Sequence, residues 1–152
     1  MNARAVHVRA VTVLAIINLT QSSRADPPAT ILRTEVDGFH SDAGVVRCIL
    51  FAAAAADGYP TKPELATAKL AAPIRNGAAI CEFTGVADGT YAVAAFHDEN
   101  DNGKLDSNFI GIPKEGTAAS NGARGSFGPP KFKDAQFVFK GPAQTVHLTV
   151  RY

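Results

Sequence analysis

The chain has 152 residues, 46% of them hydrophobic, and its 15 basic and 14 acidic residues give a formal net charge of +1. That length suits one domain with a core of its own. The balanced charge excludes the strongly basic surfaces of nucleic-acid binders and of proteins that bind membranes by charge.

The N-terminal residues 1–25 have the pattern of a secretory signal peptide. Arg4 and Arg9 give the first ten residues a positive charge. The apolar run 11–19 that follows is too short to span a bilayer. Small residues before Ala25 predict cleavage after it, which leaves 26–152 as a single domain without a transmembrane segment. The alternative is an N-terminal tail without structure. A signal peptide predicts a periplasmic or secreted protein.

The rest of the chain shows period-2 alternation and short apolar runs separated by turn residues, which indicates an all-β domain. Asn76-Gly77 predicts a hairpin turn, and the last two strands are expected to form a hairpin around Gly141-Pro142. About seven strands at regular spacing favour an antiparallel Greek-key β-sandwich. The predicted strands are 31–39, 45–53, 67–74, 78–84, 90–97, 135–140 and 145–152, with 45–53 central because its apolar run is nearly continuous.

The two cysteines, Cys48 and Cys81, both lie in predicted strands. An exported protein meets an oxidising compartment, where an even number of cysteines favours a disulfide. The alternative is two free cysteines packed as small apolar side chains.

Tyr91 follows Asp88-Gly89-Thr90 at the start of a predicted strand. This is the form of a tyrosine corner, in which the hydroxyl bonds back to the preceding connection. The longer run 83–91, FTGVADGTY, resembles a stretch of transthyretin-like and carboxypeptidase-regulatory-like sandwiches. A structural role is therefore predicted for Tyr91.

The stretch 97–132 lacks a strand or helix pattern, and so long a loop in a compact domain is usually functional or disordered. Its part 98–106, DENDNGKLD, has oxygen-bearing side chains at positions 1, 3, 5 and 9 and Gly103 at position 6. This is the spacing of an EF-hand-type calcium loop. The expected metal ligands are Asp98, Asn100, Asn102, Asp106 and the main-chain carbonyl of Lys104.

Position 12 of that pattern is Phe109, where an EF-hand has a bidentate Glu. The loop is therefore not an EF-hand, and we expect a weak calcium site completed by Glu99, Asp106 or Glu115. The alternative is a metal-free loop, in which Asp and Asn side chains bond their own backbone and Asn102-Gly103 makes a turn.

The second part of the long loop is rich in Gly and Pro and contains Arg124 at its middle. This guanidinium could pair with a carboxylate of a ligand or of the acidic part of the loop. Internal pairing is favoured, because a long loop must satisfy its own polar groups. The candidate ligand-binding residues of the stretch are His97, Glu115, Ser120, Asn121 and Arg124.

His97 beside Asp98 has the form of a general base next to a carboxylate. No Ser or Cys in a nucleophile setting accompanies it in the sequence, and Ser120 lacks the strand–elbow–helix context. A structural or loop-orienting role is therefore favoured for His97. A hydrolase that uses His97, Asp98 and Arg124 around a bound ion is the enzymatic alternative.

The loop region also resembles a known family, the exported bacterial proteins of domain-of-unknown-function family 2141. The matching stretches are 89–93, 97–106, 111–115, 120–121, 123–125, 127–130, Phe132 and 134–135. Ala119 departs from the aromatic residue that the family usually has there, and Gly122 from a second Asn. The resemblance implies an exported transthyretin-like or immunoglobulin-like sandwich, and it implies no particular activity.

The leading functional hypothesis is a non-enzymatic binding or accessory module whose partner is a small molecule, a peptide or a protein of unknown identity. Nucleic acid is not an expected partner. A third hypothesis is a structural assembly domain that uses an edge strand or the apolar residues Phe109, Ile110 and Phe127.

Overall fold

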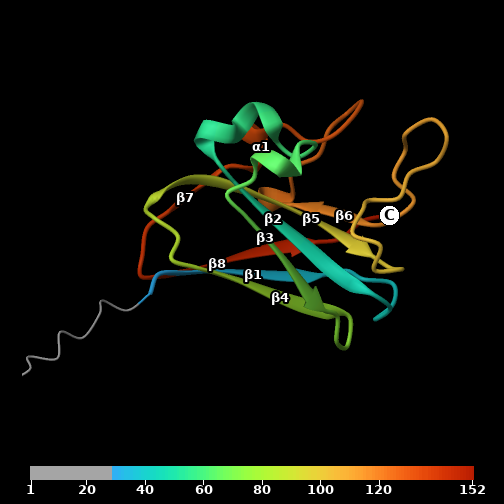
Figure 1. Ribbon diagram of the computed structural model, residues 1–152, viewed down its shortest axis with the longest axis horizontal. Coiled ribbons are helices and arrows are strands. Elements are labelled where there is room, and N and C mark those ends of the chain that lie inside the picture. Colours follow the sequence, from blue (N-terminus) through green and yellow to red (C-terminus); the bar gives the residue numbers. More distant parts are fainter. Residues whose placement is uncertain (1–28) are drawn as a thin grey trace, which may run out of the picture.

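The computed structural model describes residues 29–152, and these form two β-sheets packed face to face (Figure 1). The predicted β-sandwich is confirmed. One sheet has the order β4-β1-β8, and the other has the order β3-β2-β5-β6 with β7 also paired to β5. The strands are β1 (Ile31–Asp37), β2 (Val45–Ala52), β3 (Ala68–Pro73), β4 (Ala78–Thr84), β5 (Gly89–Asp98), β6 (Thr117–Ala119), β7 (Phe137–Phe139) and β8 (Ala143–Thr149).

The main core lies between the two sheets, and alternation along the strands fills it. In β1 the buried residues are Leu32, Thr34 and Val36, so every second side chain points inward. The predicted disulfide between Cys48 of β2 and Cys81 of β4 is present, and it crosses this core and joins the two sheets. Such a bond is typical of proteins in oxidising compartments. Within 29–152, no helix is long and apolar enough to cross a membrane.

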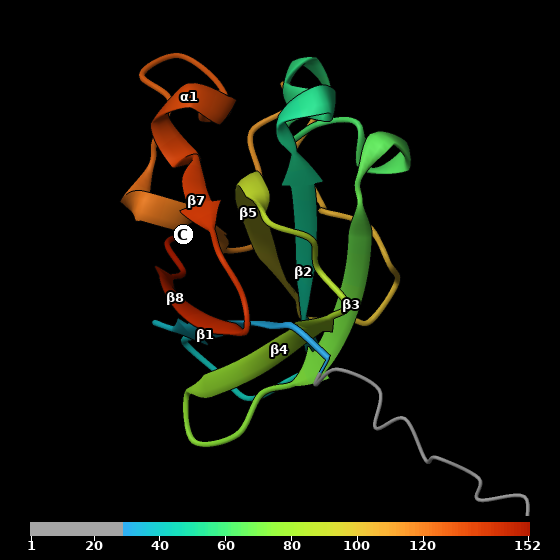
Figure 2. The same cartoon turned by 90° about the vertical axis from the view of Figure 1, so that its left-hand side faces the viewer.

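The sheet that contains β2 and β5 is covered on its outer face as well. A second apolar cluster forms there beneath the helical turns η1 (Ala53–Gly58) and α1 (Phe132–Ala135), which lie side by side at one end of the sheet (Figure 2). Two further turns are η2 (Pro63–Leu65) and η3 (Ser120–Gly122). Burial on both faces explains why the apolar run of β2 is nearly continuous, and the predicted central position of β2 is confirmed by its pairing with β3 and β5.

Two pairing predictions need correction, and one strand was missed. β8 runs parallel to β1, because the chain crosses from β7 in one sheet to β8 in the other, so the expected terminal hairpin does not form. The Asn76-Gly77 turn is present with positive φ at both residues. However, β3 and β4 enter different sheets, and across this turn only Arg75 and Ala78 pair. The long loop also contains a strand, β6, which pairs with β5 and was not predicted.

The tyrosine corner is confirmed. The Tyr91 hydroxyl donates a hydrogen bond to the Ala87 carbonyl at 3.0 Å, and the ring is buried in the main core. Gly89 suits this arrangement, because a Cβ at that position would lie 3.2 Å from the Tyr91 ring. The predicted signal peptide, 1–25, lies outside the residues that the structure describes.

Candidate functional site

The candidate site lies where β5 ends, beside the β1–β2 connection. Residues 98–116, which we call the acidic loop, leave β5 there and extend away from the sandwich (Figure 1). His97 and Asp98 are fully buried at the base of this loop. Gly44 of the β1–β2 connection permits the close approach, since its φ is +66° and a Cβ there would lie 2.0 Å from the Asp98 carbonyl oxygen.

The Asp98 carboxylate organises the start of the acidic loop. It accepts backbone hydrogen bonds from Asn102 at 3.0 Å and Gly103 at 2.8 Å, and it forms an ion pair with Arg47 Nε. Arg47 Nη2 also donates to Asp101 at 2.7 Å. Burial alone would raise the pKa of Asp98, but the guanidinium and the two N–H groups together lower it below its ordinary value.

The other predicted calcium ligands gather around Asp106. Its carboxylate accepts hydrogen bonds from the Asn100 amide at 2.9 Å and from the Asn102 amide at 3.2 Å. The amide oxygen of Asn100 accepts from the Asn102 N–H, and that of Asn102 accepts from the Lys104 N–H. The structure therefore brings the predicted side chains together, each engaged in an internal hydrogen bond.

Glu115 closes the base of the acidic loop from its far end. This residue is 6% exposed, and its two oxygens accept the N–H groups of Glu99 at 3.1 Å and Asp106 at 2.9 Å. The carboxylate thus joins the two limbs of the loop. Glu115 therefore stabilises the loop internally, and its carboxylate faces away from solvent.

The outer end of the acidic loop is a small hairpin with an apolar tip. Ser107 and Pro113 pair as an isolated bridge, and the Asn108 side chain accepts the N–H groups of Ile110 and Ile112. Phe109 is 99% exposed, Ile110 64% and Ile112 55%. We call these last three residues the apolar tip.

His97 is held by hydrogen bonds on both sides of its ring. Nε2 lies 2.7 Å from the Ala43 carbonyl, and Nδ1 lies 2.6 Å from the Tyr152 hydroxyl. Since a carbonyl only accepts, Nε2 carries the proton and Tyr152 donates to Nδ1. Burial raises the pKa of the Tyr152 phenol, even though the His40 N–H bonded to it acts in the opposite direction.

Comparison with known proteins places the chain in one family. A family model described as "Uncharacterized protein conserved in bacteria (DUF2141)" matches residues 34–147. The chain belongs to this family. No curated protein and no solved structure matches the chain significantly.

In this DUF2141 protein, Ser120 and Asn121 fasten the second part of the long loop to the sandwich. The buried Ser120 hydroxyl accepts from the Val93 N–H at 3.0 Å and donates to the Ala135 carbonyl at 2.6 Å. The Asn121 amide donates to the Gln136 carbonyl at 2.7 Å. Both predicted ligand-binding residues therefore have structural partners.

Arg124 does not pair with the acidic loop, so the expected internal pair is wrong. Its side chain is exposed, and it forms no ion pair with any residue in the described range 29–152. Arg47 of β2 supplies the guanidinium instead. Arg47 is the only charged residue in the apolar run of β2, and that position in the sequence could have drawn attention to it.

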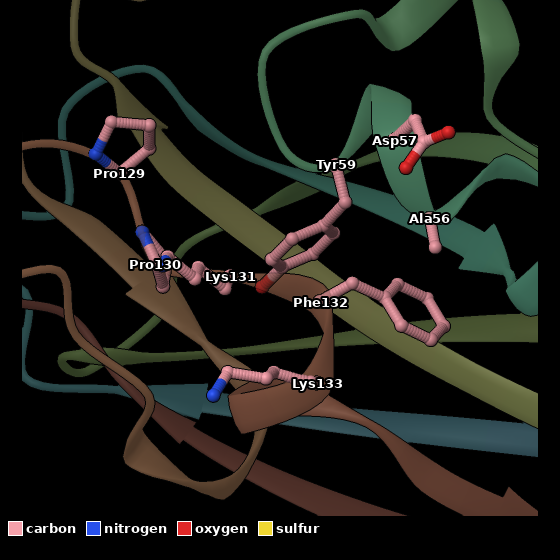
Figure 3. Close-up of a pocket in the computed structure, with 8 residues that line it drawn as sticks. All are labelled: Ala56, Asp57, Tyr59, Pro129, Pro130, Lys131, Phe132 and Lys133. Atoms are coloured by element: carbon pink, nitrogen blue, oxygen red, sulfur yellow. The ribbon is translucent and has the colours of Figure 1, made fainter.

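A shallow pocket of about 400 Å³ lies away from the acidic loop, between η1 and α1 (Figure 3). Tyr59 and Phe132 meet edge to face on its floor, and Lys131 and Lys133 also line it. Burial raises the pKa of Tyr59 well above its ordinary value, and the neutral phenol donates to the Val93 carbonyl.

Proposed function

We propose that this DUF2141 protein is an exported, non-enzymatic binding module that contacts a partner protein through the apolar tip of the acidic loop. The observation that best supports this proposal is the full exposure of Phe109 at the end of an ordered hairpin. Exposed apolar clusters rimmed by polar residues mark interaction sites, whereas single exposed apolar residues carry no such meaning.

The loop beneath the tip is held rigid by contacts that reach into the sandwich. Arg47 pairs with Asp98 and Asp101, and Glu115 joins the two limbs of the loop. Asn108 then fixes the backbone of the tip itself. A preorganised surface loses less conformational entropy on binding, so this bracing supports recognition by the tip.

The charge around the tip favours a protein partner over a membrane surface. Residues 98–116 contain five acidic and two basic residues. Anionic lipid surfaces attract polybasic segments and repel acidic ones. A partner with an apolar patch and basic residues at its rim would complement the tip.

The hydrolase alternative is the weaker candidate. Both ring nitrogens of His97 already have partners, and the ring is fully buried. Asp98 is engaged by Arg47, and Arg124 does not join either residue among the described contacts. A general base needs a free nitrogen within reach of the proton that it removes, and both nitrogens of His97 are engaged in hydrogen bonds here.

Export to the periplasm or outside the cell is part of the same proposal. It is supported by the signal pattern of residues 1–25 and by the disulfide between Cys48 and Cys81. Fractionation of the bacterium that encodes the protein should place it outside the cytoplasm. Recovery of the chain from the cytoplasm with reduced cysteines would contradict export.

A photo-crosslinking residue at position 109 tests the binding proposal in the bacterium that encodes the protein. We expect an adduct with one protein species, which is then purified and titrated. The double variant Phe109→Ser/Ile110→Ser should weaken that binding by more than about tenfold, because central apolar anchors dominate interface energies. The control Val138→Ser changes an exposed apolar residue of β7 and should leave the affinity unchanged.

Three outcomes would overturn the proposal. They are adducts with lipid alone, adducts with a second copy of this chain alone, and equal binding by the double variant and the wild type. The first would assign the tip to a membrane and the second to self-association. The third would show that the tip is not part of the interface.

A further inference from the structure

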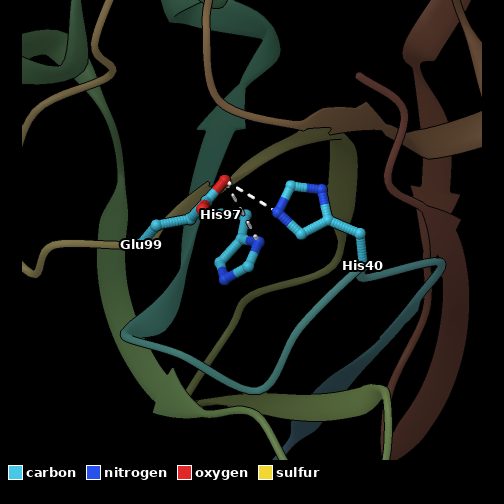
Figure 4. Close-up of side chains that lie close together, drawn as sticks. All are labelled: His40, His97 and Glu99. Carbon is cyan, nitrogen blue, oxygen red and sulfur yellow. Dashed lines mark ion pairs between the residues drawn. The ribbon is translucent and has the colours of Figure 1, made fainter.

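Three side chains with metal-ligating atoms converge beside the acidic loop. They are His40 in the β1–β2 connection, His97 in β5 and Glu99 just after β5, and their ligand atoms all lie within 4.8 Å of one another (Figure 4). We propose that this His–His–Glu cluster binds a divalent transition-metal ion of the Zn²⁺ or Cu²⁺ class. The inference is independent of the proposed partner binding, since it uses no residue of the apolar tip, and Glu99 takes part in the bracing only through its backbone N–H.

The distances within the cluster are close to those of a metal centre. His40 Nε2 lies 3.2 Å from Glu99 Oε1, and His97 Nδ1 lies 4.0 Å from the same oxygen. Ligand bonds of about 2.0–2.1 Å in tetrahedral geometry place neighbouring ligand atoms about 3.3 Å apart. Small rotations of the partly exposed Glu99 and His40 side chains toward the buried His97 would therefore close the site.

His97 is oriented as metal-ligating histidines usually are. Its Nε2–H donates to the Ala43 carbonyl at 2.7 Å. This contact fixes the tautomer and leaves Nδ1 with a lone pair that accepts the Tyr152 hydroxyl and lies 4.0 Å from Glu99 Oε1. A backbone carbonyl on the far nitrogen is one of the usual outer-shell partners of a metal-bound imidazole. It is an observation independent of the clustering itself.

Tyr152 lies at the position that the ion would enter. Its hydroxyl is 2.6 Å from His97 Nδ1, and its ring stacks on that of His40 with centroids 3.9 Å apart. A bound ion would replace this hydrogen bond. The side chain is 55% exposed, so it can move outward without disturbing the core.

The ligand set selects the class of metal. Two imidazole nitrogens and one carboxylate suit Zn²⁺ and Cu²⁺, whereas Ca²⁺ and Mg²⁺ prefer oxygen ligands. The cluster shares Glu99 with the oxygen-rich stretch 98–106, but its two imidazoles give it a different metal preference. The expected order of affinity is Cu²⁺ above Zn²⁺.

Calorimetric titration of the untagged, EDTA-treated protein with ZnCl₂ and with CuCl₂ tests the site. We expect one ion to bind per chain. His40→Ala and Glu99→Gln should each weaken binding by more than about tenfold, since the loss of an outer-shell partner alone costs about that much. In Cu²⁺-loaded protein, electron paramagnetic resonance should show two coupled imidazole nitrogens in the wild type and one in His40→Ala.

A matched control is available on β8. His147 is an exposed histidine that also pairs with a carboxylate, Glu35, at 3.3 Å, but no third ligand among residues 29–152 joins them. His147→Ala should leave metal affinity unchanged, and Tyr152→Phe should retain binding because the phenol is not a ligand. The proposal fails if the wild type binds neither ion, if His147→Ala weakens binding as much as His40→Ala does, or if Tyr152→Phe abolishes binding.

Discussion

Arg47 of β2 and Asp98 of β5 form an ion pair in which the carboxylate is completely buried and the guanidinium is 28% exposed. The pair links the core of the larger sheet to the first turn of the acidic loop, because Arg47 also donates to Asp101. The order of the loop therefore depends on a residue that lies about 50 positions earlier in the chain.

Replacement of Arg47 is expected to destabilise the protein. Arg47→Met keeps the aliphatic bulk but leaves the Asp98 carboxylate buried without its cation. The free energy of unfolding should fall by about 2–4 kcal/mol, somewhat less than for a fully enclosed pair because Arg47 is partly exposed. Urea unfolding measures the change. Arg33→Met, which removes surface pairs with Glu35 and Glu82, should have little effect.

The stability of the protein should decrease in acid through Asp98. The folded chain lowers the pKa of this carboxyl below its ordinary value of 3.8. Its contribution to stability is therefore complete above that unfolded value and is lost as the pH falls through the lower, folded value. Urea unfolding between neutral pH and pH of about 2 should show this loss. In Asp98→Asn the pH dependence should be weaker, and an unchanged profile would mean that other carboxyls carry it.

The disulfide should contribute substantially to stability, because it joins the two sheets across 33 residues of chain. The variant Cys48→Ala/Cys81→Ala should lose about 3–4 kcal/mol of unfolding free energy in the chain-entropy model. Chemical denaturation with and without a reductant measures this effect. The reductant should destabilise the wild type and leave the double variant unchanged; a double variant as stable as the oxidised wild type would contradict the expectation.

Calcium is expected to raise the melting temperature at millimolar concentration, since an ion that binds only the folded chain stabilises it by mass action. To admit the ion, the Asn100 and Asn102 amides must turn away from Asp106. The free energy needed to break these hydrogen bonds reduces the calcium affinity, which agrees with a weak site. Asp106→Ala should remove the shift, and Asp134→Ala on α1 should keep it. A wild type that shows no shift at about 10 mM calcium would exclude the site.

The sequence predicted the sandwich because alternation reports directly which side chains face the core. All seven predicted strands match an observed strand to within three residues at each end, and only β6 was not predicted. The sequence did not reveal which sheet each strand joins. Strands β7 and β8 are separated by only Lys140, Gly141 and Pro142, and so short a connection resembles a hairpin turn. Their separation depends on contacts with β5 and β1, which are distant in the chain.

The candidate site was predicted only in part. The oxygen-rich spacing of 98–106 correctly predicted that these side chains lie close together, because neighbours in a short loop are near one another in space. Arg47, His40 and Tyr152 were missed, because they reach the site through strand pairing and the packing of separate connections. For the same reason Arg124, near in sequence and opposite in charge, was wrongly expected to pair with the acidic loop.

The hairpin 106–114 is attached to the sandwich through its base alone. Its apolar tip faces solvent, while the residues that hold it, Asp98 and Glu115, lie at its root. Changes in the tip should therefore leave folding nearly untouched, whereas changes at the root should not. Such a division makes 107–112 a suitable segment for grafting a new binding sequence onto an unchanged scaffold.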